Sequence, residues 1–182
     1  MQPLRILSQQ LARLASPHRC VFTPNDLRAL FPQMSPGAFS ALLARAASSG
    51  LLGHVCRGLY VAPNVLPNDG RALFRFAARL RAHQFNYISL ETVLSDAGVI
   101  SQIPINTVFI MSSGRSNRIS CGPWGAIEFV HTEQNPADIA SELHYDQECG
   151  LWRASVAQAL RDMRATKRST DLVNQELAHE LI

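Results

Sequence analysis

Two helix-start signals and one tight turn, all between residues 23 and 63, constrain the fold more than any other feature of the sequence. The segments Thr23-Pro24-Asn25-Asp26 and Ser35-Pro36-Gly37-Ala38 each place a hydroxyl side chain directly before a proline. Such a hydroxyl caps a helix, and proline suits the first helical position because its missing N–H would be unpaired there anyway. The pattern predicts two short helices, the second of which ends at Gly50.

A short hairpin follows the second helix. Two extended runs flank the turn Cys56-Arg57-Gly58, and a turn-rich stretch at 63–70 leads away from them. The order of helix, turn, helix and two-stranded wing is that of the winged helix-turn-helix, whose second helix normally enters the major groove of DNA. An amphipathic helix over 3–15 precedes this motif. We therefore expect a winged-helix DNA-binding domain, with its linker, over residues 1–69.

The remainder, residues 70–182, is expected to be a small α+β domain with an antiparallel sheet. The expected elements are helices at 71–83 and 89–98, strands at 107–111, 118–121 and 124–132, a short helix near 136–143, a long helix from Trp152 and a last helix at 171–182. In the second helix, Ser89 is the expected cap. The loop at 112–117 is interpreted as a hairpin turn, because a phosphate-binding loop of this kind needs a helix directly after it.

The two halves of the chain carry opposite charge. Residues 1–85 hold ten arginines against two aspartates, a net +8, and residues 86–182 hold seven basic side chains against twelve acids, a net −5. A basic front suits contact with phosphates, and an acidic rear suits a different partner. Arg71, Arg75 and Arg79 lie four apart on one side of the helix at 71–83. They form either a solvated face or a contact with phosphate or an acidic partner.

Several functional classes are disfavoured. No apolar run approaches the roughly 20 residues that a membrane span needs, and the N-terminus lacks the apolar stretch of a signal peptide. We therefore expect a cytoplasmic protein that is not associated with a membrane. The four scattered cysteines suggest reduced thiols, and the six histidines show no metal-ligand spacing, so neither metal nor cofactor is expected. Cys121, Glu128 and His131 lie on neighbouring strands, but nothing fixes them as nucleophile, acid and base, and a non-enzymatic protein is expected.

The second capped helix leaves small side chains on its outer face. Ser40 can reach a base or a phosphate, Ala41 can meet a thymine methyl group, and Arg45 can pair with guanine or a phosphate. Arg57 at the wing tip and Arg28 on the preceding helix are expected to contact the DNA backbone. The candidate DNA-binding residues are Arg28, Ser35, Gly37, Ser40, Ala41, Arg45 and Arg57. Because winged helices also bind proteins, a pure protein-interaction module stays an alternative.

Several motifs together resemble a known family. They are Gly50-Leu51-Leu52, the run Arg57-Gly58-Leu59-Tyr60-Val61-Ala62-Pro63, the run from Tyr87 to Leu94, Gly98-Val99-Ile100, Gln102-Ile103-Pro104, Ser113-Gly114-Arg115 and Ile127-Glu128-Phe129 before His131. Over roughly residues 20–165 this order is similar to that of the AbiEi antitoxins of type IV toxin–antitoxin systems. The sequence departs from that family at Ala157-Gln158, where an acid–lysine pair is usual.

The resemblance implies a winged helix that binds operator repeats and represses its own operon. It also implies that the rear domain counteracts a nucleotidyltransferase toxin without forming a stable complex with it. We therefore expect a two-domain, non-enzymatic regulator of this kind. The main alternative is a winged-helix repressor whose rear domain binds a small ligand or associates with a second copy of the chain.

Overall fold

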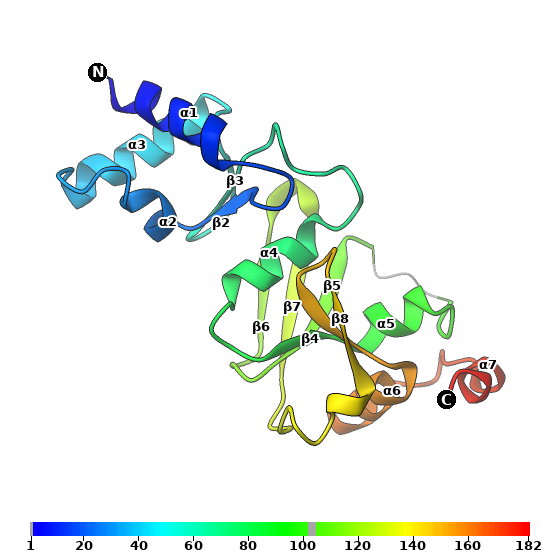
Figure 1. Cartoon of the computed structure of the whole chain (residues 1–182). Coiled ribbons are helices and arrows are strands. Elements are labelled where there is room, and N and C mark those ends of the chain that lie inside the picture. Colours follow the sequence, from blue (N-terminus) through cyan, green and yellow to red (C-terminus); the bar gives the residue numbers. More distant parts are fainter. Residues whose placement is uncertain (1, 102–104) are drawn as a thin grey trace. The chain divides into compact units, whose positions relative to one another are not determined.

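A computed structural model describes residues 2–101 and 105–182 of the chain (Figure 1). The chain divides into two compact units, Met1–Ala72 (unit 1) and Leu73–Ile182 (unit 2), and the division falls just beyond the turn-rich linker. The segment Gln102-Ile103-Pro104, one of the family-like motifs, lies outside the described residues.

Unit 1 combines three helices with a three-stranded antiparallel sheet. Its elements are α1 (Pro3–Leu14), β1 (Val21–Phe22), α2 (Pro24–Arg28), α3 (Pro36–Ser48), β2 (Gly53–Cys56) and β3 (Leu59–Val61). Both predicted caps form: Thr23 and Asp26 make a reciprocal capping box, and the Ser35 side chain accepts from the Ala38 N–H. Gly58 turns the hairpin with a φ of 79°, which favours glycine. Strand β1 pairs with β3, so the strand order of this sheet is β1-β3-β2.

The core of unit 1 forms where the apolar faces of α1 and α3 meet the sheet. Leu7 of α1, together with Leu42 and Ala46 of α3, is completely buried. Burying a leucine side chain contributes roughly 1.5–3 kcal/mol, so these few contacts fix which side of α3 faces inward. The opposite side of α3 is thereby left to solvent.

Unit 2 is built around one six-stranded sheet. Its elements are α4 (Ala72–Leu80), β4 (Asn86–Ile88), α5 (Leu90–Asp96), β5 (Thr107–Ser112), β6 (Asn117–Ser120), the 3-10 turn η1 (Gly122–Trp124), β7 (Ala126–His131), the 3-10 turn η2 (Ala140–Glu142), β8 (Leu143–Asp146), β9 (Leu151–Ala154), α6 (Val156–Ala165) and α7 (Gln175–Glu180). The strand order is β6-β7-β5-β4-β9-β8. The expected antiparallel sheet is found only in part: β4–β5, β6–β7 and β8–β9 are antiparallel pairs, but β4–β9 and β5–β7 are parallel, so the sheet is mixed.

The expected hairpin at 112–117 is also wrong. Strand β6 pairs with β7, with Ile119 opposite Ile127, and β5 lies on the other side of β7. The loop after Ser112 therefore carries the chain past the end of β7 to the far side of that strand. Alternating apolar residues identified these strands, but alternation specifies a face and not a neighbour.

Two assignments near the C-terminus are corrected as well. Trp152 lies in β9 rather than in a helix, and α6 begins after Ser155, whose side chain accepts from the Gln158 N–H. The expected helix near 136–143 is reduced to the three-residue turn η2. Strand β9 pairs with β4, a strand of only three residues that shows no periodicity of its own. The sequence of β9 likewise shows no strand pattern, so this strand could be recognised only from its pairing with β4.

The helices of unit 2 cover both faces of the sheet. Tyr87 of β4 reaches α6 through a hydrogen bond to Asp162. Met111 of β5 is paired with both Tyr87 and Val130, so these three side chains point to the same face of the sheet. Phe129, the neighbour of Val130 in β7, therefore points to the opposite face. There the guanidinium of Arg81, which follows α4, lies over the Phe129 ring. The sheet is thus sandwiched between α4 on one side and α5 with α6 on the other (Figure 1).

Candidate nucleic-acid interface

The solvent face of α3 carries small side chains. The exposed residues here are Ser35, Gly37, Ala38, Ser40, Ala41, Ala44, Arg45 and Ser48. Gly37, Ala41, Ala44 and Ser48 follow the spacing i, i+4, i+7 and i+11, so they form one stripe along the helix. A Cβ added at Gly37 would meet no atom within 4 Å, so the beginning of this stripe is open. The face therefore allows another molecule to approach the helix backbone closely.

Two of the exposed arginines of unit 1 lie on α3 or on the hairpin that follows it. Arg45 flanks the small-residue stripe of α3, and Arg57 occupies the turn between β2 and β3. Neither forms an ion pair with a carboxylate of residues 2–101 or 105–182. Both guanidinium groups are therefore available to an external anion such as a phosphate.

Arg28, by contrast, is engaged inside unit 1. Its Nη2 donates to the backbone carbonyl of Met34, and its guanidinium carbon lies 5.1 Å from the centroid of the Phe39 ring. Its Nη1 is buried without a hydrogen-bond partner among the described residues. Arg28 thus connects the turn between α2 and α3 with the Phe39 ring of α3. These contacts help to position α3.

The three arginines around α4 do not share one environment. Arg71 precedes the helix and is exposed, and its backbone N–H donates to the Asp69 carboxylate over 3.0 Å. Arg75 and Arg79 lie within α4 and are only partly exposed. The three arginines therefore do not form one fully solvated face of the helix.

The structure does not bring Cys121, Glu128 and His131 together. Cys121 is buried directly after β6, and its N–H donates to the carbonyl of Gly125, the residue before β7, over 2.7 Å. His131 lies at the far end of β7, a strand about 16 Å long at the usual rise per residue, and Glu128 points to the opposite face of that strand from His131. Within the described part of the chain, no group of three or more His, Cys, Asp or Glu side chains is arranged to hold a metal ion.

Sequence reasoning missed a buried polar cluster around Asp162 in unit 2. The Asp162 carboxylate is 0% exposed. It accepts from Ser89 Oγ at 2.6 Å, from the Nε2 atoms of Gln134 and Gln158 at 2.8 Å each, and from Tyr87 Oη at 3.2 Å. No basic side chain among the described residues pairs with it. Burial, and next the Asp162 charge, raise the pKa of Tyr87, so this phenol stays a hydrogen-bond donor.

The local sequence patterns at the residues of this cluster indicated other roles for them. Ser89 is the N-cap residue of α5, as predicted, but its side chain makes no cap bond and donates to Asp162 instead. Leu90, next to it, is fully buried with a φ of 56°, a conformation that costs free energy outside glycine. The one sequence signal was the i, i+4 spacing of Gln158 and Asp162, on the side of α6 away from its apolar stripe. A helix side away from the apolar stripe is normally expected to face solvent, whereas Gln158 and Asp162 are buried.

The β8–β9 edge of the sheet exposes an aromatic pair. Tyr145 is 52% and Trp152 43% exposed, and their rings meet edge to face with centroids 5.4 Å apart. Between Arg118 and Arg153 the chain holds six acids and no Lys or Arg. Three of these acids, Glu128, Glu142 and Asp146, are paired with arginines, and Asp138 is exposed without an ion-pair partner among the described residues. The exposed aromatic pair thus lies within a stretch of the sequence, residues 119–152, that holds acids and no Lys or Arg.

Comparisons with known proteins do not identify a family. No protein-family model matches the chain, and no curated protein matches it. What the fold establishes is a mixed α+β protein of two units. None of the helices in the described part of the chain has the length and apolarity of a membrane span.

Proposed function

We propose that this protein is a DNA-binding transcriptional regulator in which unit 1 acts as a winged helix-turn-helix and α3 as its recognition helix. The observation that carries this proposal is the exposed stripe of small side chains on α3, flanked by Arg45. Helices with small outer residues can lie deep in a major groove, which is about 12 Å wide. Arginine is the side chain that most often reads guanine there.

Each exposed residue then has a role. Ser35 and Gly37 lie at the N-terminal end of α3, where the helix dipole and the first backbone N–H groups favour a DNA phosphate. Ser40 and Ala41 face the base edges, and Arg45 pairs with guanine or with a phosphate. Arg57 at the hairpin turn contacts the DNA backbone on the wing side.

We extend the proposal to the antitoxin of a type IV toxin–antitoxin system, which represses its own operon and counteracts a nucleotidyltransferase toxin. Two observations support this extension: the ordered motifs that resemble the AbiEi antitoxins, and the exposed Tyr145 and Trp152 in a half of the chain whose net charge is −5. An enzyme that handles nucleotides has a basic cleft, which such a surface complements. A stable complex with the toxin is not expected.

Fluorescence anisotropy with the full-length protein tests the DNA-binding half. Labelled duplexes that cover its own promoter should bind more tightly than a scrambled duplex of equal length. The logarithm of the affinity should fall with the logarithm of salt concentration, with a slope of about −0.9 for each neutralised phosphate. Absence of binding to every promoter fragment at low salt would refute the proposal.

Co-expression tests the antitoxin half separately. The full-length protein should restore growth of cells that express a nucleotidyltransferase encoded beside it. The Tyr145→Ala and Trp152→Ala double variant should restore growth less well while binding promoter DNA normally. Failure of the parent protein to restore growth, with DNA binding intact, would leave a repressor and rule out the antitoxin role.

A further inference from the structure

Two arginines meet at one end of the unit 2 sheet. Arg81, just after α4, donates from Nη1 to Ser112 Oγ at 2.9 Å and from Nη2 to the Arg115 carbonyl at 2.8 Å. Its guanidinium carbon lies 3.9 Å from the centroid of the Phe129 ring, which holds the group flat against β7. A guanidinium carries five N–H donors, so these two bonds leave donors available to a ligand.

Within the described part of the chain, this arginine pair has no carboxylate counter-ion. No carboxylate of residues 2–101 or 105–182 forms an ion pair with Arg81 or Arg115. Arg153 and Arg168, which are also partly buried in unit 2, differ because each pairs with two carboxylates. Burial, and next the charge of Arg115, lower the pKa of Arg81. Two like charges held together cost free energy, and a bound anion relieves that cost.

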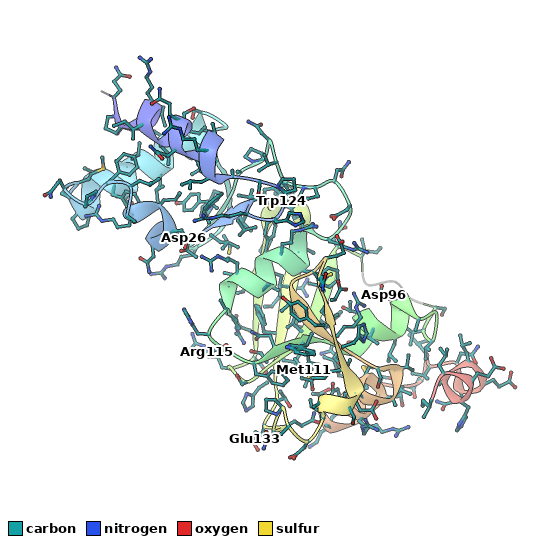
Figure 2. The ribbon with its side chains drawn as sticks, viewed as in Figure 1. Asp26, Asp96, Met111, Arg115, Trp124 and Glu133 are labelled. Carbon is teal, nitrogen blue, oxygen red and sulfur yellow. The ribbon has the colours of Figure 1, made fainter. Side chains whose placement is uncertain are left out.

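The loop between β5 and β6, which carries Arg115, offers further donors. It leaves the carboxyl end of β5, beside the end of the parallel strand β7, and ligands of open α/β sheets bind at such ends. The backbone N–H groups of Arg115 and Ser116 donate to no described acceptor. His131 at the end of β7 fixes the loop, with its Nδ1 2.9 Å from the Gly114 carbonyl. Figure 2 labels Arg115 in this loop.

We propose that Arg81, Arg115 and the loop Gly114-Arg115-Ser116 form a binding site for a phosphate group, either free or carried by a mononucleotide. A phosphate dianion balances two guanidinium charges, and its three terminal oxygens accept from several donors at once. All these residues belong to unit 2, so the site is independent of the DNA-binding proposal for unit 1. The Phe129 ring and Ser112 keep Arg81 in place before the ligand arrives.

The site can be tested by NMR on the full-length protein. Amide spectra would be recorded during titration with inorganic phosphate, with adenosine 5′-monophosphate and with adenosine, at constant ionic strength set with chloride. The amide signals of Gly114, Arg115 and Ser116 should shift saturably with the two phosphate-bearing probes and not with adenosine. Equal affinities would assign the site to free phosphate, whereas tighter binding of the nucleotide would assign it to nucleotides.

Matched variants separate a built site from general charge. Arg115→Ala should raise the Kd for phosphate about tenfold or more, because charge-assisted hydrogen bonds are lost. Arg164→Ala removes the same charge from an exposed position on α6 and should leave the Kd unchanged. Arg81→Lys keeps the charge but not the fork of donors, and it should also weaken binding in a protein that unfolds at a similar temperature. Absence of saturable shifts, equal shifts with adenosine, or equal effects of Arg115→Ala and Arg164→Ala would overturn the proposal.

Discussion

Replacing Asp162 tests how unit 2 is held together. The carboxylate is completely buried and accepts from four side chains, those of Tyr87, Ser89, Gln134 and Gln158. Asp162→Ala leaves all four donors without this acceptor. A hydrogen bond to a charged group contributes about 1.5–3 kcal/mol, but hydroxyl groups and the partly exposed Gln134 can turn to other partners, so the four losses do not add. We expect Asp162→Ala to lower the free energy of unfolding by about 3–5 kcal/mol, because several buried donors lose their acceptor at once.

Asp162→Asn should cost less. An asparagine that keeps its oxygen at the Oδ1 position still accepts from Tyr87, Gln134 and Gln158. The Ser89 hydroxyl, which donates to Oδ2 at present, can reverse and accept from the new amide. The hydrogen bonds are then kept but no longer have a charged acceptor. We expect Asp162→Asn to lower the free energy of unfolding by about 1–2 kcal/mol.

Urea unfolding at neutral pH, followed by tryptophan fluorescence, measures these costs. The chain has two tryptophans, Trp124 and Trp152, and both lie in unit 2. Asp138→Ala is the matched control, because Asp138 is exposed, and its expected effect is within about 0.5 kcal/mol. If Asp162→Ala costs no more than this control, the carboxylate does not organise unit 2. If Asp162→Asn costs as much as Asp162→Ala, the assignment of three donors to Oδ1 is wrong.

Three further predictions concern single side chains. Arg28→Ala removes the contacts that hold the turn before α3, so it should destabilise unit 1 by about 1–3 kcal/mol in a thermal melt; an unchanged melting temperature would contradict this role. Arg45→Ala should relax sequence preference at one base pair by roughly 1–3 kcal/mol, whereas Arg57→Ala should weaken binding to all duplexes alike; competition with single-base variants of the promoter duplex distinguishes the two. Burial, and next the neighbouring aspartate, raise the pKa of the Cys149 thiol from 9.0 to about 12. Its stabilising contribution is therefore complete below pH 9 and is lost as the pH rises toward 12, so urea midpoints should fall over that range more steeply in the parent than in Cys149→Ala.

Local features of this protein could be predicted from its sequence. The caps of α2 and α3 formed as expected, because Thr23 with Asp26 and Ser35 with Ala38 interact across three residues and depend on nothing distant. The outer face of α3 was also predictable, since the spacing of its apolar residues determines which side is buried. The candidate DNA-contacting face of α3 is therefore almost entirely a property of the sequence.

The tertiary structure decided what depends on distant residues. Ser89 was expected to cap α5, yet its hydroxyl donates to Asp162, which lies 73 residues further along the chain. Arg28 was expected to face DNA, yet it packs on Phe39. The strand order of unit 2 likewise turned the loop after Ser112 from a hairpin into the crossover that carries Arg115 toward Arg81. Side-chain period determines which face of an element is apolar, but the partner that meets this face is selected only when the whole chain packs.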